Sequence, residues 1–144
     1  MENERIQLAK KYFNAAWDLI DKKARTKEDD AQMLHLAHAS CLLWQEAENP
    51  VNNSVGQWQV SHVYALLRNG SLALTYAELC LKTTREGSVG PFYHAFAYEA
   101  LARAYGVLGE EEKKREAIEA GLEWCEKVPD PKDRAYVRGE LLSI

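Results

Sequence analysis

Few residues of this chain have the type and spacing that a metal ion requires. His35, His38 and Cys41 lie three residues apart, and imidazole and thiolate groups are ligands that Zn²⁺ accepts. On a helix this spacing spreads the three side chains across about 120° of the surface, so a site would also need His62 or His94. Histidines on an apolar helix are more often hydrogen-bonded core residues. We therefore expect no metal site and no cofactor.

Residues that could catalyse a reaction are also sparse. Acidic side chains cluster at residues 29–30 and 110–112, where helices are expected to begin and the helix dipole favours acids. Neither cluster has a neighbouring His or Ser to exchange a proton. The Gly-Ser-Val-Gly segment at 87–90 lacks the preceding strand and the Lys of a phosphate-binding loop. We expect the protein not to be an enzyme.

The elements that would position any site are helices. Apolar residues recur three and four positions apart, and Gly, Pro and Asn interrupt the helical runs. The expected helices span about 4–24, 27–48, 55–68, 71–85, 91–108, 110–128 and 131–142. Thr26 with Asp29 predicts a capping box, Gly70 predicts a left-handed helix end, and Gly109 is expected to end the fifth helix. Residues 50–56 are interpreted as the longest linker.

The composition predicts one domain that folds without crosslinks. Its 144 residues suffice for a sizeable core, and Cys41, Cys80 and Cys125 are too far apart in the sequence to suggest a disulfide framework. The middle of the chain is poor in charge, as expected for inner helices that neighbours cover. The sequence has no basic stripe for nucleic acid, no membrane span and no signal peptide, so we expect a cytoplasmic protein.

Two stretches of the chain repeat one another. Residues 60–67 (VSHVYALL) align without gaps on residues 101–108 (LARAYGVL), and a second helical run follows each stretch. Such self-similarity marks stacked helical repeats, because one helix pair cannot bury its apolar face alone. The sequence therefore predicts an all-α, right-handed stack of antiparallel helix pairs. The expected pairs cover residues 1–48, 54–86 and 91–128, and a capping helix covers 130–144.

The second copy resembles a known repeat family. It is similar to the tetratricopeptide repeat pattern at Tyr98, Leu101, Ala102, Tyr105, Gly109, Ala117 and Pro129. The spacing departs from that pattern, because Ala117 follows Gly109 by eight residues where the family has about five. Segments such as 37–40 and 95–103 also resemble an uncharacterised bacterial group of tetratricopeptide-like proteins. The resemblance implies the fold and brings no activity with it.

The resemblance also implies which residues face a partner. In this repeat type the first helix of each pair lines a concave wall, and the groove positions correspond to Val55, Trp58, His62, Ala65, Leu66, Phe96, Glu99, Arg103, Gly106 and Val107. Trp58 with His62, and likewise Glu99 with Arg103, lie one helical turn apart. We expect Trp58, His62, Phe96, Glu99 and Arg103 to bind an extended peptide, a chain terminus or a helix of a protein partner.

Three alternatives stay open at this point. Glu99 and Arg103 could form an exposed helix pair worth a few tenths of a kcal/mol, with Trp58 packed between repeats. A small-molecule pocket among the inner helices would be lined by His38, Tyr64 and Tyr98. A structural or self-associating protein, such as a homodimer, would instead present an apolar patch without a cleft.

Overall fold

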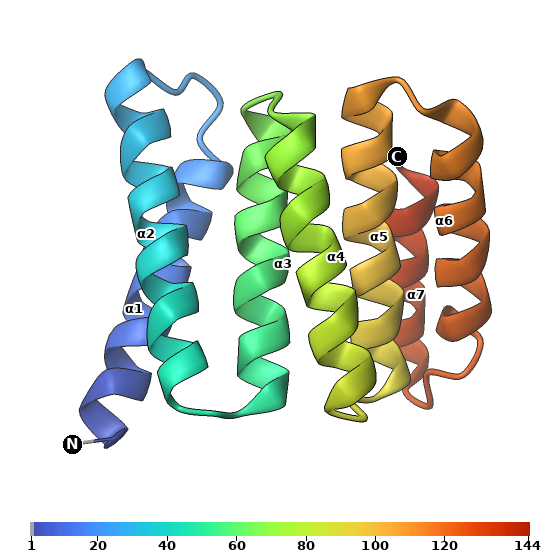
Figure 1. Cartoon of the computed structure of the whole chain (residues 1–144), viewed down its shortest axis with the longest axis horizontal. Coiled ribbons are helices and arrows are strands. Elements are labelled where there is room, and N and C mark those ends of the chain that lie inside the picture. The colour runs from blue at the N-terminus through green and yellow to red at the C-terminus, as the bar shows by residue number, and fades with distance from the viewer. Residues whose placement is uncertain (1) are drawn as a thin grey trace.

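The described part of the protein folds into seven α-helices and contains no strand. The computed structural model describes the backbone of residues 2–144 and the side chains of residues 4–144. The helices are α1 (Glu2–Ile20), α2 (Lys27–Glu46), α3 (Pro50–Leu66), α4 (Gly70–Glu86), α5 (Pro91–Leu108), α6 (Glu111–Cys125) and α7 (Pro131–Leu142). Each helix packs against the next, and neighbours run in alternate directions (Figure 1). The predicted all-helical class is confirmed.

The odd-numbered helices form one layer of the structure. Helix α3 contacts both α1 and α5, and α5 also contacts α7. The even-numbered helices α2, α4 and α6 each pack against the odd-numbered helices that precede and follow them in the chain. In Figure 1 α1 lies behind α2, and α7 lies behind α5 and α6. Side chains of the four odd-numbered helices therefore share one side of the molecule.

Several helix ends follow the local signals in the sequence. Thr26 and Asp29 form the predicted capping box, in which each side chain accepts a hydrogen bond from the other residue's backbone N–H. Gly109 ends α5 in the left-handed conformation, with φ of 75°. Pro91 begins α5, where its missing N–H costs no intrahelical hydrogen bond.

Residues 50–56 are not a linker, and that prediction was wrong. Asn49 caps α3 by accepting hydrogen bonds from the backbone N–H groups of Val51 and Asn52, so the helix begins at Pro50. Ser54, one of the polar residues that suggested a loop, faces another helix, because its buried hydroxyl is hydrogen-bonded to the Thr84 hydroxyl of α4 at 2.7 Å.

Three other expected helix ends also differ from the structure. Helix α1 stops at Ile20 rather than near residue 24, and the Arg25 guanidinium donates to the Ile20 carbonyl beyond that end. The left-handed residue after α3 is Arg68, with φ of 64°, whereas Gly70 already belongs to α4. Helix α6 ends at Cys125, three residues earlier than expected.

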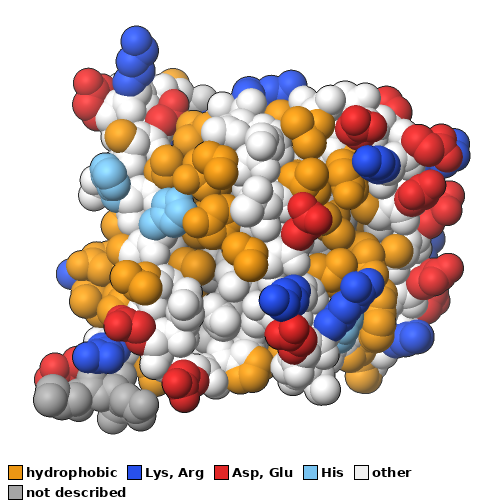
Figure 2. Space-filling model, in the orientation of Figure 1, with side chains coloured by type: hydrophobic (Ala, Val, Ile, Leu, Met, Phe, Trp, Pro, Cys, Tyr) orange, Lys and Arg blue, Asp and Glu red, His pale blue; other side chains and the backbone are white. Residues whose placement is uncertain are grey.

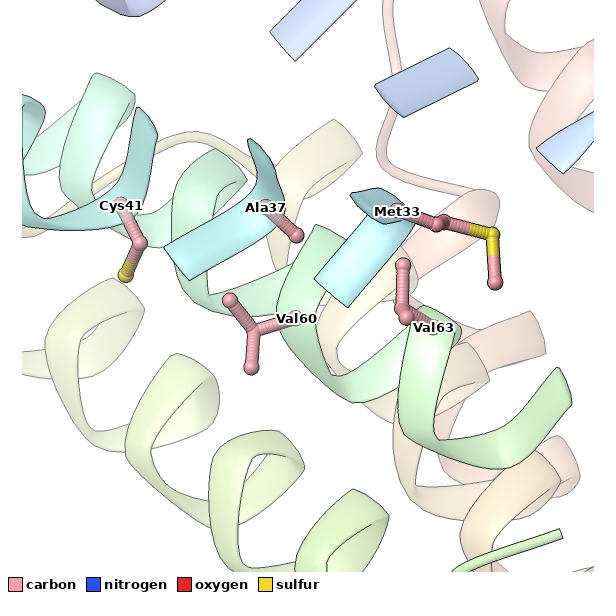
Figure 3. Close-up of a cluster of buried hydrophobic side chains, with 5 residues drawn as sticks. All are labelled: Met33, Ala37, Cys41, Val60 and Val63. Atoms are coloured by element: carbon pink, nitrogen blue, oxygen red, sulfur yellow. The ribbon is translucent and has the colours of Figure 1, made fainter. Parts of the chain in front are cut away.

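Small apolar side chains fill the contact between α2 and α3. Met33, Ala37 and Cys41 from α2 face Val60 and Val63 from α3, and all five are buried (Figure 3). The two backbones approach closely at Gly56 of α3. A Cβ atom added there would lie 3.1 Å from the Cα atom of Cys41. Cys41, Cys80 and Cys125 are buried free thiols, in agreement with a chain that folds without crosslinks.

Charged side chains are most numerous over the outer helices of the array. Figure 2 shows them gathered over α6, whereas hydrophobic side chains cover more of the surface between α2 and α4. This agrees with the low charge of the middle of the chain, since inner helices are covered by neighbours. Among the described residues, no helix combines the length and the apolar character needed to cross a membrane.

The close approach at Gly56 yields a stability prediction. Gly56→Ala should lower the free energy of unfolding by about 1 kcal/mol, because overpacking against the α2 backbone outweighs the higher helix propensity of Ala. Gly139→Ala in α7 is the matched control. No neighbouring atom lies within 4 Å of its added Cβ, so it should stabilise by about 0.5–1 kcal/mol. Urea unfolding of the two variants measures both values, and equal effects would contradict the packing argument.

Candidate functional site

An aromatic pocket of about 160 Å³ lies on the layer of odd-numbered helices. Its rings come from four helices: Phe13 and Trp17 of α1, Trp58 of α3, Phe92, Tyr93 and Phe96 of α5, and Tyr136 of α7. Ser54, Val55 and the buried Cys80 complete the lining. The wall is thus almost entirely apolar, and we call this site the aromatic pocket.

A second hollow adjoins the aromatic pocket and shares four of its rings. Trp17, Trp58, Phe96 and Tyr136 line both spaces, and the second adds Ile20, Asp21, His62 and Glu140. We call it the acidic hollow, because the acidic side chains of Asp21 and Glu140 line it. The two spaces together form a continuous surface across α1, α3, α5 and α7.

Trp58 is the central ring of this surface. Its ring centroid lies 5.0 Å from that of His62 and 5.8 Å from that of Trp17, and both neighbours are stacked on it. Phe96 meets Trp58 edge-on, with the two centroids 5.6 Å apart. Such stacked and edge-on pairs are favourable arrangements for aromatic rings. Trp58 therefore connects the rings of α1, α3 and α5 into one cluster.

A buried carboxylate holds the Trp58 ring in place. Glu99 of α5 is fully buried, and one of its oxygens accepts a hydrogen bond of 3.1 Å from Trp58 Nε1. Its other oxygen accepts from Arg103 Nε at 3.0 Å, and Arg103 Nη2 lies 3.5 Å from a Glu140 oxygen of α7. Burial raises the pKa of Glu99, and the Arg103 charge and the two hydrogen bonds oppose that rise.

His62 lies beside this ion pair as a neutral imidazole. Burial, reinforced by the Arg103 charge, lowers its pKa to about 4. Its Nδ1 atom is buried and has no hydrogen-bond partner among the described residues. A protonated ring would therefore have no acceptor for the N–H group at that position. At neutral pH His62 therefore adds a flat aromatic surface to the acidic hollow and no positive charge.

The structure brings the five residues of the predicted partner-binding site together, but in different roles. Trp58, His62 and Phe96 line the pockets, whereas Glu99 does not reach the surface. The exposed helix pair considered for Glu99 and Arg103 is also wrong, because only the Arg103 side chain is partly exposed, at 26%. Of the other groove positions, Val55 lines the aromatic pocket, and Ala65, Leu66, Gly106 and Val107 line a third hollow together with Arg103.

The sequence did not single out several residues that line the two spaces, among them Phe13, Trp17, Asp21, Tyr136 and Glu140. The groove positions of the repeat were assigned only to the first helices of the second and third pairs, so α1 and α7 contributed no candidates. A usable signal was nevertheless present. Phe13 with Trp17, and likewise Tyr136 with Glu140, have the four-residue spacing that had singled out Trp58 with His62.

The structure also places the residues that were considered for a small-molecule pocket and for a metal site. The hydroxyl of Tyr64 and Nε2 of His38 are hydrogen-bonded at 2.9 Å, whereas Tyr98 accepts from Arg85 and lines a separate hollow. Among the described residues, Tyr98 is therefore in a different hollow from the one considered with the hydrogen-bonded pair of His38 and Tyr64. His35 is exposed and Cys41 is buried against α3, so the three candidate metal ligands of α2 do not converge.

Comparisons with known protein families, with curated proteins and with solved structures gave no match to this chain.

The buried ion pair predicts a large loss of stability when its carboxylate is removed. Glu99→Ala should cost about 3–5 kcal/mol, because the Trp58 donor and the Arg103 charge both lose their partner. Glu99→Gln should cost less, since an amide oxygen can still accept from Trp58. The control is Glu112→Ala, which breaks an exposed pair with Arg115 and should cost at most about 1 kcal/mol. Chemical denaturation of these variants tests the ranking.

The lowered pKa of His62 predicts a pH dependence of stability. Between pH 6.5 and about 4 the unfolded chain binds a proton that the folded protein does not, so stability falls as the pH falls. The full loss is at most about 3 kcal/mol. His62→Phe keeps a ring against Trp58 and should remove this loss of stability at low pH. His35→Gln changes an exposed position and should leave the loss unchanged. Unfolding measured at pH 7 and pH 4.5 distinguishes them, and an unchanged slope in His62→Phe would refute the assignment.

Proposed function

We propose that this protein is a tetratricopeptide-like stack of helix pairs that binds a peptide segment of a partner protein. The alternate directions of neighbouring helices and the single layer of odd-numbered helices support this stacking. In that arrangement the odd-numbered helices are the first members of the pairs, and they carry the aromatic pocket and the acidic hollow. The proposal makes the protein a binding module without catalysis.

The aromatic pocket is the observation that carries this proposal. Rings from four helices surround about 160 Å³ of apolar space, and the Tyr136 side chain at its edge is 58% exposed. Energetically important residues of interfaces are commonly aromatic or apolar side chains that fill such pockets. An apolar side chain of a bound peptide would remove these rings from water, which favours binding by about 25 cal/mol per Å² of apolar area buried.

The surrounding charges favour an internal peptide segment over a free carboxyl terminus. A terminal carboxylate would need an available cation, but the Arg103 guanidinium is already paired with the buried Glu99. Asp21 and Glu140 would also repel a second carboxylate in the acidic hollow. Of the three ligand forms that the sequence suggested, an extended segment or a helix with an apolar anchor therefore fits better than a chain terminus.

Selection from a library of random peptides displayed on phage tests the proposed function. The immobilised protein should enrich peptides that share an apolar side chain. Tyr136→Ala should lower the affinity for the enriched peptides roughly tenfold or more. Tyr136 is mostly exposed, so this variant should keep its helicity and its stability.

Leu42→Ala is the matched control for that experiment, because Leu42 is 56% exposed and lies on α2, outside the layer of odd-numbered helices. It should leave peptide affinity unchanged. Absence of any enriched peptide, or equal binding by Tyr136→Ala and the unmodified protein, would overturn the proposed function.

A further inference from the structure

The acidic hollow combines two features that suit a positively charged ligand. Its aromatic walls are shared with the aromatic pocket, and its acidic side chains are Asp21 and Glu140. No Lys or Arg side chain of the described residues lines it. The hollow is therefore an apolar, aromatic surface with carboxylates at its edge, next to the place where the proposed anchor would bind.

Nearby positive charge does not neutralise this hollow. The Arg103 guanidinium is paired with the buried Glu99, and His62 is neutral at pH 7. Arg103 also approaches one oxygen of Glu140, but at 3.5 Å this contact is long, and the Glu140 side chain remains 37% exposed. Asp21 is exposed and forms no ion pair among the described residues. The carboxylates of Glu140 and Asp21 therefore remain available to a ligand.

The pKa of the Tyr136 phenol is raised by burial and by the same negative environment. Burial raises its pKa, and the charges of Glu140, Glu99 and Asp21 raise it further. Three carboxylates that oppose ionisation of one phenol would favour a cation at that position. A cation placed over an aromatic face also gains from the ring quadrupole.

We propose that the acidic hollow binds the side chain of an arginine on the partner peptide, beside the apolar side chain that occupies the aromatic pocket. This inference rests on the proposed peptide-binding function and specifies its charge selectivity. Arginine fits better than lysine because its planar guanidinium stacks on aromatic rings and is more weakly hydrated than an ammonium group. Its N–H groups can meanwhile donate to the carboxylates of Asp21 and Glu140.

The test compares each enriched peptide with a synthetic copy in which citrulline replaces arginine. Citrulline keeps nearly the same shape and removes the charge. We expect most enriched peptides to carry an arginine near the apolar anchor, and the citrulline copy to bind about threefold to thirtyfold more weakly by calorimetry. Raising the salt concentration should weaken the arginine peptide more than its citrulline copy.

A double variant, Asp21→Asn with Glu140→Gln, tests the protein side of the contact. It should bind the arginine and citrulline peptides nearly equally, while still binding the apolar anchor. The matched control is Glu119→Gln with Glu123→Gln, which removes two exposed charges from α6 and should keep the full preference for arginine. Circular dichroism confirms that both double variants remain helical.

The possible failures of this experiment are distinguishable. Enriched peptides with an apolar anchor and no basic residue would overturn the arginine inference and leave the proposed function standing. Equal affinity for the citrulline copy, or for a copy with lysine in place of arginine, would also overturn it. A library that yields no binding peptide would overturn the proposed function and this inference together.

Discussion

The buried carboxylate of Glu99 is the constraint on which the candidate site depends. A fully buried charge is costly unless it is paired and hydrogen-bonded, and here one oxygen accepts from Trp58 while the other accepts from Arg103. The first bond joins α3 to α5 and orients the central ring of the aromatic pocket. Through Arg103 the same group connects α5 to Glu140 of α7. The positions of three helices relative to the pocket are thus tied to one side chain.

Packing elsewhere leaves the large rings free to line that pocket. Helix α5 buries a series of small side chains against its neighbours: Ala95, Ala97, Ala100, Ala102 and Ala104. Small residues at such contacts allow helices to approach closely and interlock. Phe92 and Phe96 of the same helix are only partly buried and point into the aromatic pocket. The division between small and large side chains therefore separates the core of the stack from its binding surface.

The same ion pair also determines the charge of the surface. The resemblance assigns His62, Glu99 and Arg103 to groove positions, which suggests a polar groove with both signs of charge. In the structure Glu99 is buried, Arg103 is engaged and His62 is neutral at pH 7, so the surface is aromatic with a negative edge. The negative edge therefore determines which peptides the surface suits, because complementary electrostatic potentials govern the choice of partner.

The sequence by itself determined the helical class, the Thr26 capping box, the end of α5 at Gly109 and the grouping of Trp58 with His62. These features depend on residues three or four positions apart, and such short-range geometry can be read from a sequence. Tertiary structure alone decided that residues 50–56 are helical, that Glu99 is buried and that Tyr136 joins Trp17 in one site. Those outcomes depend on partners far along the chain, such as Thr84 for Ser54 and Trp58 for Glu99, and local spacing contains no information about which distant side chain will meet a given group.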